Sequence, residues 1–101
     1  MDIRGGTTMT IDMIREKVIS LVQQYHITRV VLFGSRASGS NSESSDVDLI
    51  VEFSQPVTLM QLSQLRIDLE ELLGLDVDVI HGPVRETDII EIGSTIELYA
   101  A

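Results

Sequence analysis

Apolar side chains recur with a helical period in two parts of the chain. The first stripe begins after Thr10, whose hydroxyl suits a helix N-cap, and the second ends before Gly74, a residue type that commonly terminates helices. Spacings of three and four residues place the members of each stripe on one helix face. The members are Ile11, Ile14, Val18, Leu21, Val22 and Tyr25 in the first stripe, and Leu62, Leu65, Leu69, Leu72 and Leu73 in the second, which spans Leu59 to Leu73. The pattern predicts two long amphipathic helices.

Three short segments have the patterns of β-strands. Residues 29–33 (RVVLF) form a β-branched apolar run, residues 46–53 (DVDLIVEF) alternate apolar and polar side chains, and residues 76–80 (DVDVI) alternate again. In the second segment one side carries Val47, Leu49, Val51 and Phe53, and the other side carries Asp46, Asp48, Ile50 and Glu52. Residues 34–45 (GSRASGSNSESS), which join the first two strands, are predicted to form a connecting loop.

The last part of the chain, after His81-Gly82-Pro83, carries mixed signals. Its β-branched residues and Gly93 lower its helix propensity, whereas the preceding turn and the spacing of Glu91 and Glu97 favour a helix. We therefore expect a third helix there. The resulting element order predicts an α+β fold, in which a small mixed β-sheet has helices packed on one face. The uncovered face would then carry the acidic strand residues Asp46, Asp48 and Asp78.

Length and composition indicate one folded domain. With 101 residues, the folded chain should expose roughly 5,700 Å², so that folding hides about 65% of the extended surface. Its 44% apolar and 23% charged residues are atypical of a disordered chain, and no apolar run approaches the roughly 20 residues of a membrane span. We place the domain at residues 10–101, after a flexible extension at residues 1–9. Because the first residues lack a signal-peptide pattern, we expect a cytoplasmic protein.

Charge narrows the classes of function. The chain has 16 acidic and 7 basic residues, a formal net charge of −9, and such a surface repels nucleic-acid phosphates. We therefore expect neither direct nucleic-acid binding nor membrane association. The chain has no cysteine, which excludes disulfides, thiol catalysis and zinc-thiolate sites. An acidic protein that handles phosphates needs bound divalent cations.

Asp46 and Asp48 are the first candidates for a cation site. Because they are two positions apart on a strand, they share a face, with α-carbons about 6.6 Å apart. Two negative charges at that distance repel by roughly 2 to 3 kcal/mol at an effective dielectric near 20, and Asp78 on another strand adds to this repulsion. Carboxylate oxygens at this separation suit Mg²⁺ or Mn²⁺, with positions left for the phosphates of a nucleotide. The alternative is that the aspartates are solvated strand ends.

Gly34 and Ser35 are candidates for phosphate binding. They follow the first predicted strand, where a turn or short helix would present backbone N–H groups to an anion, and Ser35 adds a hydroxyl donor. Gly34 lets the backbone approach a ligand closely, and Gly39 lets the loop turn back toward the next strand. Ordinary turn formation is the alternative explanation of the two glycines when they are taken alone.

Taken together, these residues resemble a known signature. The pattern G-S-x-x-x-G followed by S-D-x-D-L, from Gly34 to Leu49, is similar to the nucleotidyltransferase signature of the DNA polymerase beta superfamily. The helix before it, the helix after it and the V-D-V strand resemble the minimal nucleotidyltransferase family in particular. The resemblance extends over roughly residues 10–101, and it implies the fold of that family.

The resemblance also implies roles for individual residues. Two Mg²⁺ ions, or Mn²⁺ in their place, would bind to Asp46, Asp48 and Asp78, with Asp76 the less favoured candidate for the third carboxylate. The nucleotide would contact Gly34, Ser35, Arg36 and Ser45. The family usually has a second arginine where this chain has Ser38, so Arg36 would contact phosphate alone or with help from elsewhere.

The resemblance finally implies a reaction and a partner. An acceptor hydroxyl would displace pyrophosphate at the α-phosphate of ATP, and a transferase of this size needs another protein to present the acceptor. In the family this partner is frequently a HEPN-type ribonuclease toxin, whose tyrosine receives AMP and which is thereby silenced by its antitoxin. Two alternatives stay open: an antitoxin that neutralises its partner by binding alone, and transfer to a small hydroxyl compound such as an aminoglycoside. We expect a homodimer or a hetero-oligomer.

Overall fold

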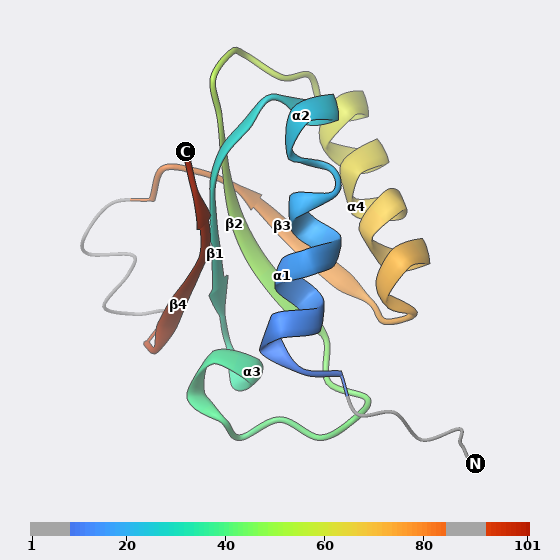
Figure 1. The fold of residues 1–101 in the computed structure, drawn as a ribbon, viewed down its shortest axis with the longest axis vertical. Coiled ribbons are helices and arrows are strands. Elements are labelled where there is room, and N and C mark those ends of the chain that lie inside the picture. Colours follow the sequence, from blue (N-terminus) through green and yellow to red (C-terminus); the bar gives the residue numbers. More distant parts are fainter. Residues whose placement is uncertain (1–8, 85–92) are drawn as a thin grey trace.

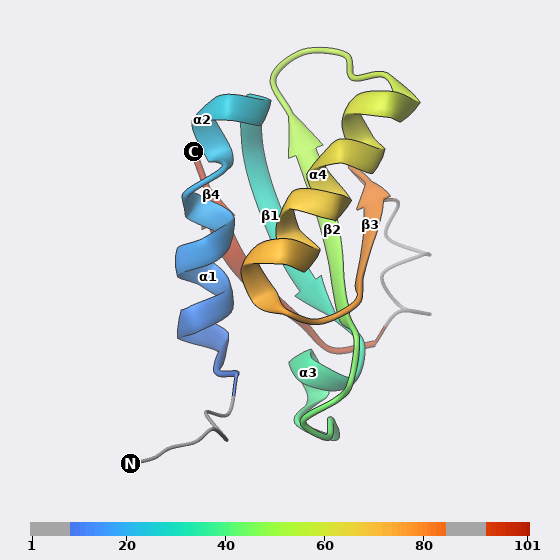
Figure 2. The same ribbon diagram turned by 90° about the vertical axis from the view of Figure 1, so that its right-hand side faces the viewer.

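The structure, a computed structural model, describes residues 9–84 and 93–101. These residues form a sheet with the strand order β3-β2-β1-β4, and the two longest helices lie along one side of it (Figures 1 and 2). The helices are α1 (Ile11–Ile19), α2 (Val22–Tyr25), α3 (Ser35–Ser38) and α4 (Leu59–Leu73). The strands are β1 (Ile27–Phe33), β2 (Val47–Phe53), β3 (Val77–His81) and β4 (Thr95–Ala100).

The sheet is mixed. β1 pairs antiparallel with both β2 and β4, whereas β2 pairs in parallel with β3. Neighbouring parallel strands need a long crossover between them, and here α4 provides it. The predicted α+β class, with a small mixed sheet and helices on one face, is confirmed.

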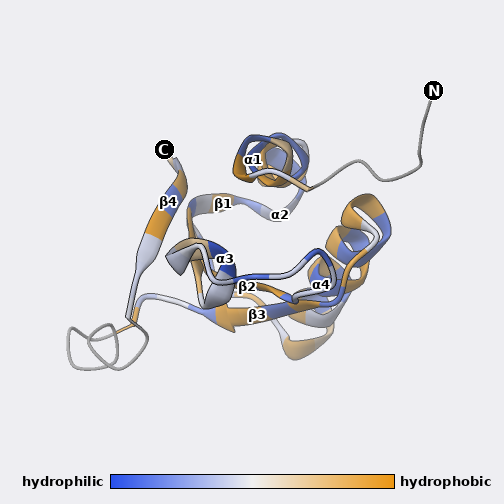
Figure 3. Cartoon of the chain, turned by 90° about the horizontal axis from the view of Figure 1, so that it is seen from below, coloured by the Kyte–Doolittle hydropathy of each residue, from blue (hydrophilic) through white to orange (hydrophobic). Residues whose placement is uncertain are grey.

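The hydrophobic core lies between the sheet and the two longest helices. Seen along the sheet in Figure 3, α1 and α4 lie on the same side of the strands. The alternation of β2 directs Leu49 and its two apolar neighbours toward these helices, where they meet Val30 and Leu32 of β1 and Leu65 of α4. Leu32, Leu49 and Leu65 are 0% exposed. The apolar stripes found in the sequence are therefore the core faces of their elements.

The opposite face of the sheet is partly covered, where an open face was expected. Val31 and Ile50 point to that side and are nevertheless buried. The chain after β3 folds back over them, since a Cβ on Gly82 would lie 3.0 Å from the Cγ2 atom of Ile50. Glycine at this position therefore allows the backbone to pass directly over the strand.

The first helix is shorter than the apolar stripe predicts. Thr10 caps α1 as expected, with its hydroxyl accepting a hydrogen bond from the Met13 N–H at 3.1 Å. The helix ends at Ile19 because the Ser20 hydroxyl donates to the Lys17 carbonyl at 2.6 Å and the Leu21 N–H bonds three residues back, to Val18. The remaining part of the stripe belongs to the separate short helix α2.

Helix α4 has the predicted bounds. Thr58 and Gln61 form a capping box at its start, and Gly74 ends it in the left-handed conformation with a φ of 69°. Leu65, Leu69 and Leu73 of the predicted stripe are buried, whereas Leu72 is 40% exposed and does not belong to the core. At that position the sequence pattern overestimated the width of the buried face.

The tail was predicted as a helix, and this was wrong for its last part. Residues Thr95–Ala100 form the edge strand β4, which pairs with β1. Glu97, whose spacing favoured a helix, instead binds Arg29 of β1 with 2.8 Å between Oε2 and Nε, and Arg29 also contacts Glu52 of β2 at 3.1 Å. Arg15 of α1 adds a bond from its Nε to the Leu98 carbonyl at 3.1 Å. These contacts are distant in sequence, so local spacing does not reveal them.

The remaining predictions on organisation concern the chain ends. The part of the predicted helix at residues 85–92, which includes Glu91, lies outside the described residues, as do residues 1–8 of the predicted extension. Met9 is described and packs against the core. None of the described helices combines the length and the apolar character that crossing a membrane requires.

Candidate active site

The topology brings the candidate residues to one end of the sheet. Because β1 runs antiparallel to β2, and β2 parallel to β3, the end of β1 lies beside the beginnings of β2 and β3. Figure 1 shows this end next to α3 and the loop that leads into β2. Gly34 follows β1, Asp48 is the second residue of β2, and Asp78 is the second residue of β3. Three segments that are far apart in sequence therefore meet here.

Asp48 and Asp78 are direct neighbours across the parallel pair. Their α-carbons are partners in the register between β2 and β3, and both side chains leave the face opposite to the core. Asp46 precedes β2 and is exposed. The structure thus brings Asp48 and Asp78 together, with Asp46 beside them at the start of the strand.

Asp76 takes a backbone role. Its carbonyl accepts a hydrogen bond from the Val47 N–H at 2.9 Å, which fixes the entry of the chain into β2. It lies before the first residue of β3, whereas Asp78 pairs in register with Asp48. This arrangement favours Asp78 over Asp76 as the third carboxylate.

Gly34 brings the backbone into contact with the Asp48 carboxylate. A Cβ at this position would overlap the Asp48 Oδ2 atom, and the φ of 78° and ψ of −157° belong to a region that glycine occupies almost alone. The absence of a side chain therefore leaves the room in which this carboxylate lies. The sequence indicated close approach at Gly34, and the structure identifies what approaches it.

Ser35 and Ser45 lie at the two ends of the loop. Ser35 begins α3, a single helical turn in which the N–H groups of Ala37 and Ser38 both bond the Gly34 carbonyl at 3.1 Å. The Ser45 hydroxyl accepts a hydrogen bond from the Ser42 N–H at 2.9 Å, within the loop itself. Both serines are half-buried. The nucleotide contacts proposed for them stay predictions.

Arg36 is buried inside the loop. It is 5% exposed, and its guanidinium donates to the Ser45 carbonyl from Nε at 3.1 Å and from Nη2 at 2.9 Å, and to the Glu43 carbonyl at 3.1 Å. The phosphate contact of Arg36 stays a prediction. The sequence did not indicate that its guanidinium would bind backbone carbonyl groups. The sequence does contain an indirect signal for this role of Arg36. Residues 39–45 contain no apolar side chain that could anchor the loop, so another residue must hold it.

The local charges act most strongly on Asp48. Burial raises the pKa of its carboxyl, the adjacent Asp78 raises it further through charge and hydrogen bonding, and the charge of Asp46 adds to the increase. A raised pKa means that the folded protein disfavours the ionised form of this group. Ionisation of Asp48 therefore opposes folding when no cation is present to neutralise its charge.

We expect Asp48→Asn to stabilise the fold at neutral pH when divalent cations are absent. The folded protein holds the Asp48 proton more tightly than the unfolded chain, so stability falls as the pH rises from the ordinary aspartate pKa through the raised one. The variant should therefore melt at a higher temperature at pH 7, and this gain should vanish below the ordinary pKa. Thermal unfolding followed by circular dichroism, with and without a chelator, measures both effects.

Saturating Mg²⁺ should shrink the gain, because the cation neutralises the same charges in the parent protein. Glu71→Gln, at an exposed position on α4, removes one negative charge away from the site and serves as the control. Equal melting shifts for the two variants would contradict the clustering of charge at Asp48.

The residues present fit a divalent cation that shares its coordination with a substrate. In the described part of the chain, no group of three or more histidine, aspartate and glutamate side chains is close enough to form a complete metal centre. The closely paired carboxylates are Asp48 and Asp78. Mg²⁺ is commonly held by one or two carboxylates, with water and substrate phosphates completing its octahedron. The site therefore suits Mg²⁺ together with a nucleotide better than Mg²⁺ alone.

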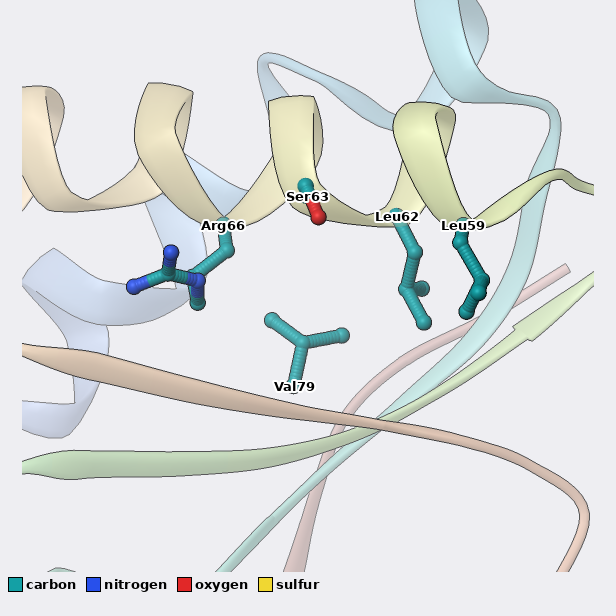
Figure 4. A pocket seen from close by; sticks show the side chains of 5 residues that line it. All are labelled: Leu59, Leu62, Ser63, Arg66 and Val79. Carbon is teal, nitrogen blue, oxygen red and sulfur yellow. The ribbon is translucent and has the colours of Figure 1, made fainter.

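A shallow groove between α4 and β3 is separate from this site. Leu59, Leu62, Ser63 and Arg66 line it from the helix, and Val79 lines it from the strand (Figure 4). Val79 follows Asp78 directly, and alternate strand residues point to opposite faces. The groove therefore opens on the helix side of the sheet, away from the carboxylates.

Comparison with known proteins gives consistent matches. The model of the nucleotidyltransferase domain family matches residues 11–97. A putative protein adenylyltransferase of Methanocaldococcus jannaschii is 39% identical over 72 residues, which are 71% of this chain and 77% of that protein.

Two solved structures share the fold. A toxin–antitoxin structure with AMP-PNP contains a chain that matches with a TM-score of 0.72 at 22% identity, over 86% of this chain and 73% of that one. The structure of a tri-AMPylated HEPN toxin from Shewanella oneidensis in complex with MNT antitoxin gives a TM-score of 0.67 at 19% identity, over 91% of this chain and 74% of that one.

Proposed function

This chain belongs to the nucleotidyltransferase domain family, and we propose that it is a Mg²⁺-dependent protein adenylyltransferase that acts as an antitoxin. It would transfer AMP from ATP to a tyrosine hydroxyl of a HEPN-type toxin and thereby silence that toxin. The observation that carries the proposal is the register of Asp48 with Asp78, directly beside the bare backbone of Gly34. The arrangement offers paired carboxylates for a cation next to a turn that can receive phosphates.

The reaction is a displacement at the α-phosphate of ATP. The acceptor oxygen forms a bond to the α-phosphorus while the bond from that phosphorus to the bridging oxygen breaks and pyrophosphate leaves. Asp78 would take the proton of the acceptor hydroxyl, and its exposed position beside Asp48 supports this role. Bound Mg²⁺ ions, two in this proposal, would lower the pKa of that hydroxyl and neutralise the charge of the pyrophosphate.

The charge balance supports the need for cations. Three carboxylates and a triphosphate carry about seven negative charges in one site. Among the described arginines, Arg15, Arg29 and Arg66 form ion pairs with carboxylates elsewhere on the chain. These three described arginines are therefore engaged away from the carboxylates, and the proposal assigns to Mg²⁺ the role of supplying positive charge at the site.

The partner is proposed from the relatives. The Methanocaldococcus jannaschii relative is named a putative protein adenylyltransferase, and the two solved structures are toxin–antitoxin complexes, one with AMP-PNP and one with an AMPylated HEPN toxin. These names support a toxin of this class as the protein that presents the acceptor hydroxyl.

Incubation of the purified chain with a HEPN-type toxin, ATP and Mg²⁺ tests the proposal. Intact-mass spectrometry should show the toxin gaining the mass of one or more AMP units, and tryptic peptides should locate them on tyrosine. Omission of Mg²⁺ is the matched control and should abolish the gain. No gain of mass at any metal concentration, together with undiminished protection of cells by Asp48→Asn, would favour neutralisation by binding alone.

A further inference from the structure

Arg36 occupies an unusual position for a charged residue. Among the residues that the structure describes, Arg36 is the one charged residue that is buried. No carboxylate in that part of the chain lies within salt-bridge distance of it. A buried charge needs hydrogen-bond partners to compensate for lost hydration. Backbone carbonyls of Ser45 and Glu43 provide them here, at 2.9 to 3.1 Å. The guanidinium is therefore committed to the loop.

The loop has few other anchors. Residues 39–45 are glycine, serine, asparagine and glutamate, and their side chains are exposed or half-buried. Its further contacts are hydrogen bonds among the loop residues and α3, such as the one between the Ser40 N–H and the Ser35 carbonyl at 3.0 Å. A segment of this composition buries too little apolar surface to hold one conformation by packing. Arg36 is the buried side chain that holds this loop, through its hydrogen bonds to the Ser45 and Glu43 carbonyls.

The atom that Arg36 holds most firmly is next to Asp46. Both Nε and Nη2 converge on the carbonyl oxygen of Ser45, which belongs to the peptide unit that joins Ser45 to Asp46. On the other side of Asp46, the Val47 N–H is fixed by the Asp76 carbonyl at 2.9 Å. Asp46 is thus held between two backbone anchors, and Arg36 provides the first of them.

We propose that Arg36 is a positioning residue that fixes Asp46 for metal binding by locking the Ser45 carbonyl, in place of contacting phosphate itself. The inference rests on the proposed function in that Asp46 is taken as a metal ligand. Arg36 also follows Gly34 and Ser35 on α3, so its grip ties the glycine turn to the start of β2. The guanidinium thus adds a second link between the glycine turn and the carboxylates, beside the pairing of Phe33 with Asp48.

Titration of the chain alone with Mn²⁺, followed by the electron paramagnetic resonance signal of the free ion, tests this role without nucleotide or partner. Residues that hold metal ligands in place typically contribute about 10- to 100-fold to metal affinity. We expect Arg36→Gln to weaken Mn²⁺ binding by at least about tenfold. Arg36→Lys, which keeps the charge but loses the two-donor grip, should fall between Arg36→Gln and the parent protein. Arg66→Gln, at an exposed ion pair on α4, is the control and should bind as the parent does.

A double-mutant cycle shows whether Arg36 acts through Asp46. In an Asp46→Asn background, Arg36→Gln should cause no further loss of Mn²⁺ affinity, because the ligand that it positions is already gone. An equal loss in both backgrounds would overturn the proposal. So would unchanged Mn²⁺ affinity in Arg36→Gln accompanied by a higher KM for ATP, since that pattern belongs to a direct phosphate contact.

A measurement on the unmodified protein covers the case in which the variants do not fold. Amide order parameters for residues 42–45 should be near the value of about 0.85 that is typical of rigid backbone, and values below about 0.6 would overturn the proposal. The proposed function can fail separately. A chain that shows the Mn²⁺ pattern but transfers no AMP would contradict the adenylyltransferase activity and leave the role of Arg36 standing.

Discussion

Asp78→Asn is expected to reduce the rate of AMP transfer at least about 1,000-fold, whereas Asp76→Asn should stay within about threefold of the parent enzyme. The two variants make the same chemical change two positions apart on one segment. Asp78 pairs in register with Asp48 and contributes to raising the pKa of Asp48, so we expect the Asp78 carboxylate to take part in the reaction. Asp76 acts through its backbone carbonyl, which asparagine retains.

Single-turnover transfer of AMP to the toxin, measured by intact mass, gives the two rates. Circular dichroism should show that both variants keep the fold, because Asp78→Asn relieves repulsion with Asp48 and Asp76→Asn retains the backbone carbonyl that bonds Val47. A large loss in Asp76→Asn with an active Asp78→Asn would reverse the assignment of the third carboxylate. Losses below tenfold in both variants would show that neither the Asp76 nor the Asp78 carboxylate takes part in the chemistry.

Gly34→Ala should cause the second large effect, with transfer falling at least about 100-fold and stability falling by about 1 to 3 kcal/mol. A methyl group there overlaps the Asp48 carboxylate, and alanine rarely adopts a φ of 78° with a ψ of −157°. The carboxylate must move or the turn must shift. The first response displaces a proposed metal ligand, and the second displaces the turn proposed to receive phosphates.

Gly74→Ala separates backbone strain from the collision. Gly74 also has a positive φ, of 69°, but a Cβ there would meet no atom within 4 Å, and the residue ends α4. This control should lose stability and keep its activity once folded. Urea unfolding gives the free energies of unfolding. Transfer rates are compared without urea, at a temperature below the melting points of both variants. Equal activity in the two alanine variants would contradict the role of the bare backbone at Gly34.

The elements that the sequence predicted well have local signals. Helix α4 has a capping residue at Thr58, an apolar stripe and a terminal glycine, so its bounds follow from spacing alone. The strand β2 follows from alternation, and the same alternation placed Asp48 opposite to the core. In these segments, short-range patterns and the final packing agree.

The elements that the sequence missed depend on contacts between distant residues. β4 forms because Glu97 and its neighbours pair with β1, some 68 positions earlier, and no local spacing records that partner. The burial of Arg36 likewise depends on carbonyl groups seven and nine positions later in the chain. Backbone acceptors are the same for every residue type, so composition can indicate that the loop lacks apolar anchors but not which carbonyl groups bind Arg36. The sequence nominated the residues of the candidate site, whose roles stay predictions, but it did not indicate which contacts hold them.

The parallel pairing of β2 with β3 has a consequence for protein synthesis. Asp78 is made thirty positions after Asp48, and the whole of α4 must be in place before the two can meet. A nascent chain that ends before β3 has the glycine turn and two of the three carboxylates, but it lacks the partner strand. Enzymatic protection against a toxin would therefore begin only after β3 has been made and has paired with β2.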